Sequence, residues 1–375
     1  TRLQGDWSSD VCSSDLMQPS GLEKLLPIYL TRPDLIELSE SFLRVIEESL
    51  ERFDYGRALD LAADWLFRLE NQPPTDRLSD QKAAIRLWRA ELLTQLQRWD
   101  QASEEVDGLL CRRTSIEESQ LLVRALLVAA QLHGMYGEQE LALQAIAESQ
   151  ALDPNDNFRA QRELEQARLW VRSGELESAL ALLPLHPHTL DESAIERGRV
   201  LFRLHRFDQA KEAWFSVLEV PAYQESKVTT QSRFQAESFR LLGLLHQELG
   251  EPLQALVYLE KSLAAFWKLK LWIGVAKSYE GLGQVCSDLG RLTEALHFTH
   301  KAERLSRRLG AESELAVVYG RLGNLCMKLG DFARAIRFHQ LDVELCRRYG
   351  NYRALAYALS SLGLSYRAQG DQQLA

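Results

Sequence analysis

The C-terminal half of the sequence repeats itself every 40 residues, and this period limits the possible folds more than any other feature. In each period a Leu-Gly pair is followed seven residues later by a second glycine, and an alanine stands five residues after that glycine. A fixed period of this length indicates stacked structural units rather than a single globular core. The three series are Gly243, Gly283, Gly323 and Gly363; Gly250, Gly290, Gly330 and Gly370; and Ala255, Ala295, Ala335 and Ala375.

Each period predicts a pair of antiparallel helices. Leu242, His246 and Leu249 recur at three- or four-residue steps, which places them on one face of the first helix. The glycine of the Leu-Gly pair lets the second helix cross closely, and the second glycine supplies the left-handed backbone that ends the first helix. A single pair cannot bury its apolar face, so neighbouring pairs must stack. The sequence therefore predicts an all-α solenoid, and no segment shows the alternation of a β-strand.

This pattern resembles the tetratricopeptide repeat, whose usual length is about 34 residues. The 40-residue units are similar to the long repeats of kinesin light chains and of Leu-Gly-Asn-type regulators of spindle orientation, and Leu322-Gly323-Asn324 reproduces that triplet. The resemblance implies a right-handed superhelix whose first helices line a concave groove that binds a peptide or a partner domain. If the groove positions of the family carry over, they fall on Arg240, Gln247, Lys277, Glu280, Gln284, Asn324, Met327, Tyr357 and Arg367.

Weaker copies of the unit precede the regular ones and keep the alanine. We expect divergent repeats over residues 34–225, regular repeats over 226–375 with the last one truncated, and a linker or partial helix over 17–33. Residues 1–16 back-translate to a sequence that resembles a sequencing-library adapter and are excluded from the fold. On this interpretation the chain is a fragment at both ends. The alanines of the weaker copies are Ala58, Ala102, Ala142, Ala179 and Ala210.

The net charge of −9 is unevenly distributed. Residues 1–200 carry 21 Lys and Arg against 35 Asp and Glu, whereas residues 201–375 carry 23 against 18, so the two halves should meet different partners or different parts of one. Basic residues recur 40 apart at Lys268, Arg308 and Arg348, but cations are favoured at helix C-termini by the helix dipole. With the acidic total, this predicts no nucleic-acid partner. No apolar run is long enough to cross a membrane, and the scattered cysteines fit a reducing cytoplasm.

Catalytic and metal-binding patterns are incomplete. His297 and His300 lie three residues apart, with His339 in the next repeat, but no carboxylate or thiol completes a metal-binding set. Gly281-Leu282-Gly283 begins like a dinucleotide-binding motif, yet Cys286 stands where the third glycine should be. We therefore expect no cofactor, no metal and no enzymatic activity. Cys286 and Cys326 share a repeat position with His246, which predicts that they fill a packing slot between helices.

Two functions remain open from the sequence. In the first, the chain is a non-enzymatic scaffold or sensor that holds a peptide or partner domain in its groove. In the second, it is the regulatory arm of a longer signalling protein whose output domain is a kinase, nucleotide cyclase, caspase-like peptidase or DNA-binding module. Because a repeat array normally ends in a polar cap, the break within the last repeat favours the second function. Partner identity and oligomeric state stay open.

Overall fold

The structure, a computed structural model, describes residues 55–70, 76–95, 98–112, 119–183, 191–219, 228–348 and 352–370. These residues form sixteen helices and contain no strand. The chain divides into two compact units, residues 1–85 and 86–375, which are described separately. The segments 1–16 and 17–33 lie outside the described residues.

The first unit contributes α3 (Tyr55–Glu70) and the beginning of α4 (Asp76–Gln95). On α3, Leu59, Ala62, Leu66 and Leu69 are buried, and their three- and four-residue spacing puts them on one face of the helix. This buried apolar stripe is the pattern that favours an amphipathic helix. Ala58, the alanine expected for the first weak repeat, lies on α3, but its side chain is outside the described set.

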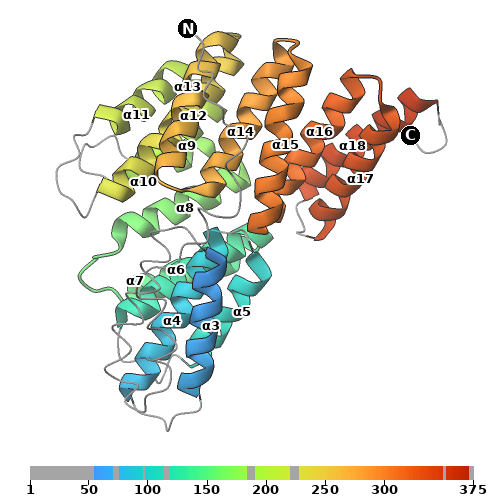
Figure 1. Ribbon diagram of the computed structural model, residues 1–375. Coiled ribbons are helices and arrows are strands. Elements are labelled where there is room, and N and C mark those ends of the chain that lie inside the picture. Colours follow the sequence, from blue (N-terminus) through green and yellow to red (C-terminus); the bar gives the residue numbers. More distant parts are fainter. Residues whose placement is uncertain are drawn as a thin grey trace. The chain divides into compact units, whose positions relative to one another are not determined.

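Successive helices of the second unit pack in pairs (Figure 1). The alanines of the weaker repeats lie near the starts of the second helices, and all four are 0% exposed: Ala102, Ala142, Ala179 and Ala210. A larger side chain at these positions would push the paired helices apart. The helices of this part are α5 (Trp99–Leu110), α6 (Ser119–Tyr136), α7 (Gln139–Ala151), α8 (Arg159–Ser173), α9 (Leu176–Leu182), α10 (Asp191–Arg203) and α11 (Phe207–Glu219).

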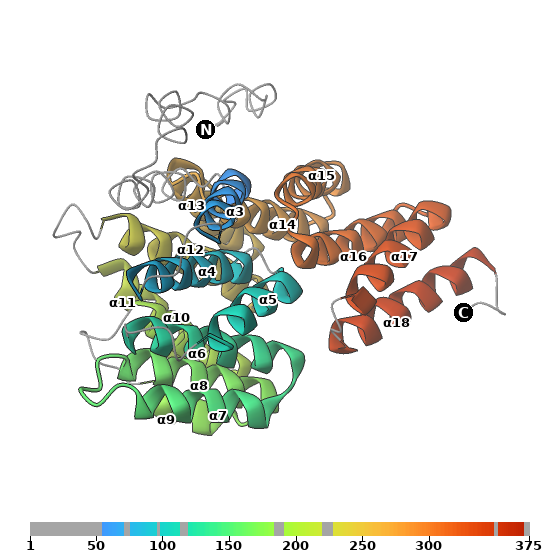
Figure 2. The same cartoon turned by 90° about the horizontal axis from the view of Figure 1, so that it is seen from below.

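The regular repeats continue the same packing. Within them α12 packs on α13, α14 on α15, and α16 on α17, while the first helices of neighbouring repeats also touch, α12 with α14, α14 with α16, and α16 with α18 (Figure 2). This arrangement confirms the predicted all-α solenoid. The helices are α12 (Val228–Glu248), α13 (Pro252–Lys268), α14 (Trp272–Asp288), α15 (Leu292–Leu309), α16 (Glu312–Lys328), α17 (Phe332–Arg348) and α18 (Tyr352–Gln369).

The glycine of each Leu-Gly pair is where the two helices of a repeat come closest. A Cβ atom on Gly243 would lie 2.7 Å from Cγ of Leu259, and one on Gly283 or Gly323 would strike the side chain at the equivalent position of the second helix, Thr299 or His339. Leucine, threonine and histidine thus fill the same slot, so the close approach depends on the glycine. Gly363 is half-buried on α18. The repeat alanines Ala255, Ala295 and Ala335 are all 0% exposed.

The second glycine of each repeat ends the first helix. Gly290 has a φ of +73°, and the N–H of the following Arg291 donates to the Cys286 carbonyl at 2.8 Å, which closes a Schellman-type cap. Gly250, Gly330 and Gly370 share the left-handed conformation. His205 adopts it as well, with a φ of +58°, after the first helix of an earlier repeat where no glycine is present.

His339 places an ionisable group in the slot beside Gly323. The side chain is 1% exposed and neither ring nitrogen has a hydrogen-bond partner among the described residues, so burial lowers its pKa from 6.5 to about 4. Protonation is therefore easier in the unfolded chain than in the folded one. The contribution of the neutral ring to stability is intact above about pH 6.5 and is lost as the pH falls toward 4, by roughly 2 kcal/mol at about pH 4.5.

His339→Leu is expected to remove this pH-dependent component, because the equivalent position of α13 already holds a leucine, Leu259, against Gly243. Urea unfolding of the wild type and of His339→Leu at about pH 7 and about pH 4.5 measures this pH-dependent component of stability. Other groups titrate in this range, so the informative quantity is the difference between the two proteins. An equal loss of stability in wild type and variant would contradict the assignment.

Candidate binding site on the first helices

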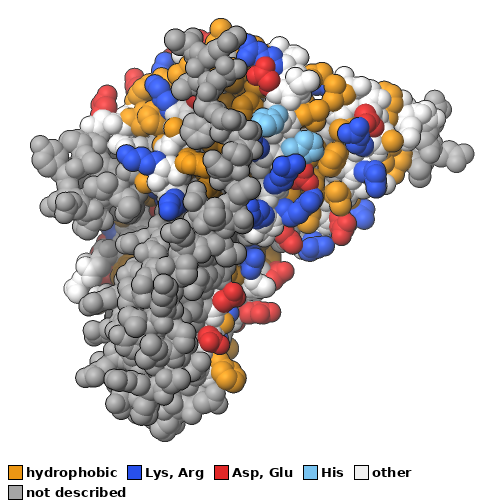
Figure 3. Space-filling view, in the orientation of Figure 1, with side chains coloured by type: hydrophobic (Ala, Val, Ile, Leu, Met, Phe, Trp, Pro, Cys, Tyr) orange, Lys and Arg blue, Asp and Glu red, His pale blue; other side chains and the backbone are white. Residues whose placement is uncertain are grey.

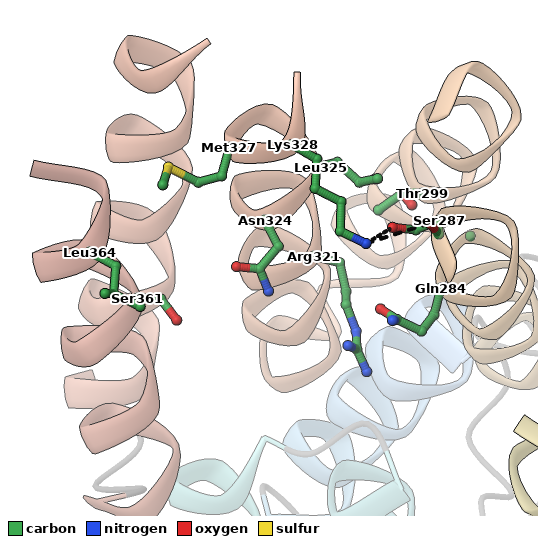
Figure 4. Close-up of a pocket in the computed structure, with 11 residues that line it drawn as sticks. Gln284, Ser287, Thr299, Arg321, Asn324, Leu325, Met327, Lys328, Ser361 and Leu364 are labelled. Carbon is green, nitrogen blue, oxygen red and sulfur yellow. Dashed lines mark hydrogen bonds between the residues drawn. The ribbon is translucent and has the colours of Figure 1, made fainter. Parts of the chain in front are cut away.

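A cavity of about 340 Å³ lies where the first helices α14, α16 and α18 face one another (Figure 4). It collects side chains from three consecutive repeats because equivalent positions of successive first helices share one face of the stack. Asn324 and Ser361 extend toward the same space from α16 and α18, and Gln284 points into it from α14. The lining residues are Gly283, Gln284, Ser287, Thr299, Arg321, Asn324, Leu325, Met327, Lys328, Ser361 and Leu364.

The cavity combines polar groups without protein partners and apolar surface. Within the described part of the chain, the Asn324 carboxamide and the Ser361 hydroxyl make no hydrogen bond, whereas Gln284 donates to Asp288 at 2.9 Å. Met327 is half-buried, and Leu364 is 48% exposed. Donors, acceptors and apolar side chains are therefore available to a bound molecule within one small volume.

Three residues expected in the groove are instead held by neighbouring charges. Lys277 Nζ lies 3.1 Å from Glu314 Oε1, and Arg321 Nε donates to Glu280 Oε1 at 2.7 Å, so two ion pairs join α14 to α16. Arg240 donates to Glu237 through Nε at 2.8 Å and Nη2 at 2.6 Å. These side chains contact other parts of the protein in this structure, and their role in ligand binding stays a prediction.

The pairs extend toward the N-terminus and together form a groove ladder along the first helices α8, α10, α12, α14 and α16. Arg168 of α8 contacts Glu192 at 2.7 Å and Glu196 at 3.4 Å on α10, and Arg199 of α10 pairs with both Glu196 and Glu237. The groove ladder consists of Arg168, Glu192, Glu196, Arg199, Glu237, Arg240, Lys277, Glu280, Glu314 and Arg321. Opposite charges thus join α8 to α10, α10 to α12, and α14 to α16.

The remaining expected groove residues lie apart from the cavity lining. Gln247 donates to Asp288 at 2.6 Å and so links α12 to α14. Tyr357 is 66% exposed on α18, and Arg367 is exposed near the end of that helix. The structure therefore gathers Gln284, Asn324 and Met327 at the cavity and distributes the other six along the face.

Arg321, Lys328 and Ser361 line the cavity although repeat positions did not indicate them. Arg321 and Lys328 lie three residues before and four residues after Asn324, so they share its helix face. Helical spacing from Asn324 would have found them. Lys328 is also anchored, because its Nζ donates to Ser287 Oγ at 2.7 Å.

The described residues offer little for covalent or metal chemistry. No three His, Cys, Asp or Glu side chains come together as a metal site in the described ranges, and His339 is buried against Gly323, away from the exposed His297. Burial raises the pKa of the Cys286 thiol to about 11 and that of Cys346 to about 12. Such thiols stay protonated at neutral pH and are poor nucleophiles. None of the helices in the described part has the length and apolar character of a membrane span.

Comparison with known proteins gives the repeat class. A family model of the tetratricopeptide repeat matches residues 314–375, which include most of α16 and all of α17 and α18. No curated protein matches the chain by sequence. The class of repeat protein is therefore inferred from the C-terminal repeats and from the fold.

Two solved structures share the fold over most of both chains. The apo form of the quorum sensor NprR from B. thuringiensis is similar with a TM-score of 0.52 and 13% identity, covering 91% of this chain and 96% of that one. A Rap protein complexed with Competence and Sporulation Factor also gives a TM-score of 0.52, with 12% identity and coverage of 90% and 99%. Residues 314–375 therefore match the tetratricopeptide-repeat model, and the chain shares the helical-solenoid fold of these two structures.

Proposed function

We propose that the chain is a non-enzymatic scaffold or sensor that holds a peptide segment of a partner protein against α14, α16 and α18. The observation that carries the proposal is the cavity in which Asn324 and Ser361, beside Met327 and Leu364, have no hydrogen-bond partner among the described residues. A carboxamide can donate to and accept from a peptide backbone, while the apolar side chains receive a side chain of the peptide.

The groove ladder supports this position for the peptide. Most charges along the first helices are already paired, so a ligand that bound over them would have to replace protein ion pairs. At the cavity it would meet Asn324 and Ser361 without breaking a protein contact. A site that is formed before binding loses less affinity to reorganisation.

The solved relatives in fold support a sensor role for this chain. One is a quorum sensor and the other is complexed with Competence and Sporulation Factor. The alternative function, the regulatory arm of a longer signalling protein, uses the same binding face and differs in what the chain controls. It stays a prediction from the sequence.

A random-peptide display library selected on the purified protein tests the proposal. Selected peptides are expected to bind Asn324→Ala/Met327→Ala at least about tenfold more weakly, a change of about 1.4 kcal/mol, because one polar and one apolar contact are lost. Fluorescence anisotropy with a labelled selected peptide measures the dissociation constant. Gln254→Ala, which removes an exposed carboxamide from α13, is the matched control and should bind normally. Peptides that bind the double variant as tightly as the wild type would place the site elsewhere.

A further inference from the structure

The cations of the groove ladder pair with carboxylates. In the described part of the chain, several cations on the second helices of the regular repeats do not. Lys261 of α13, Lys301 and Arg304 of α15, and Arg337 and Arg347 of α17 form no ion pair with a carboxylate in the described part of the chain. We call these five residues the basic face. All but the half-buried Lys301 are exposed.

The charges of the basic face act on a neighbouring histidine. Lys301 and Arg304 are three residues apart on α15, and His297 lies one turn before Lys301 on the same side of that helix. Partial burial and the charges of Lys301 and Arg304 lower the pKa of His297. Lys and Arg side chains, with histidine among them, gather over the C-terminal repeats in Figure 3. The face therefore attracts anions.

Apolar side chains are interspersed with these cations. Leu253 is 65% exposed and Val257 44% exposed on α13, and Leu341 is 39% exposed on α17. Val257 is equivalent to Arg337 two repeats later, and Leu341 is equivalent to Lys301 one repeat earlier. A nucleic-acid backbone offers nothing to exposed leucine and valine, and the net charge of −9 opposes a long polyanion. A protein segment that has both carboxylates and apolar side chains matches both features.

We propose that the basic face is a second docking surface, for an acidic amphipathic helix of a partner protein. Glutamate or aspartate side chains of that helix pair with Lys301, Arg304 and Arg337, and its leucines cover Val257 and Leu341. The surface lies on second helices, whereas the cavity is lined mainly by first helices. One chain can therefore hold two partner segments at the same time. Binding at the basic face does not depend on the peptide proposed for the cavity.

A labelled 20-residue helical peptide with glutamates on one side and leucines on the other is the probe. Fluorescence anisotropy should show binding to the wild type and at least tenfold weaker binding to Lys301→Glu/Arg304→Glu, since two attractive charges become repulsive. Lys211→Glu/Arg233→Glu, which reverses two charges on α11 and α12, is the matched control and should bind within about twofold of the wild type. Circular dichroism melts establish that both double variants fold.

Two further probes identify the occupant. A peptide with the leucines replaced by serine should bind at least tenfold more weakly, and equal binding would overturn the amphipathic part of the proposal.

A 20-nucleotide single strand of thymidines and a 20-base-pair duplex should bind more weakly than the acidic peptide, and tighter binding of either would assign the face to nucleic acid instead. Unchanged peptide binding by Lys301→Glu/Arg304→Glu would also overturn the proposal. Asn324→Ala/Met327→Ala should bind the acidic peptide normally, which separates this surface from the cavity.

Discussion

Gly283→Leu is expected to lower the free energy of unfolding by at least about 3 kcal/mol, because the new side chain has no space between α14 and α15. Its Cβ would strike Thr299 Oγ1 and stand 3.3 Å from the Ala295 carbonyl oxygen. The backbone of α15 must therefore move, and a rotamer change alone cannot relieve the clash. Urea unfolding followed by circular dichroism measures the loss.

Gly290→Ala is the matched control on the same helix pair. A Cβ at Gly290 would have no atom within 4 Å, so the variant bears only the penalty of its φ of +73°, about 1 kcal/mol. If both variants were equally destabilised, backbone conformation and not close helix packing would explain the role of Gly283.

Glu237→Ala is the second substitution with a large expected effect, a loss of about 3–5 kcal/mol. Burial alone would raise the pKa of Glu237, but the Arg240 and Arg199 guanidinium groups hold it well below its usual range. Removing the carboxylate leaves Arg240, whose side chain is only 13% exposed, without its ion-pair partner on α12. Chemical denaturation at neutral pH measures the loss.

The pH dependence of the wild type follows from the same pair. Because the folded pKa of Glu237 is lowered, its contribution to stability is present above about pH 4.5 and is lost as the pH falls below that value. Glu237→Leu/Arg240→Met removes both charges together and should recover most of the stability that Glu237→Ala loses. A double variant as unstable as the single one would show that side-chain volume, and not the unpaired charge, causes the effect.

Repeat position predicted the packing well because it follows from backbone geometry. Ala295 and Ala335 are fully buried where two helices meet. The packing slot expected for Cys286 and Cys326 is occupied by both thiols, which are 1% and 3% exposed. His205 shows where this reasoning ends: a histidine takes the left-handed conformation that the other repeats give to glycine, so a search for glycine alone misses that cap.

The partners of individual side chains could not be predicted in the same way. Repeat position indicated Arg240 as a ligand-binding residue. In the structure its guanidinium binds Glu237, which also forms an ion pair with Arg199. Arg199 lies in a repeat of irregular length, so the 40-residue period does not align it with Glu237. Repeat position also failed to indicate Arg321 in the cavity lining. Arg321 shares a helix face with Asn324, and its guanidinium contacts Glu280.

The groove ladder makes joints between the first helices more sensitive to salt than the pair within α12. Arg199 joins α10 to α12, and Lys277 and Arg321 join α14 to α16; they are 39%, 32% and 39% exposed. Glu237 and Arg240, which pair within α12, are 16% and 13% exposed. Dissolved salt screens exposed pairs far more than buried ones. The α10–α12 and α14–α16 joints are therefore both sensitive to salt, and the second of them borders the cavity. Ionic strength can thus change the width of the cavity while the pair inside α12 stays formed.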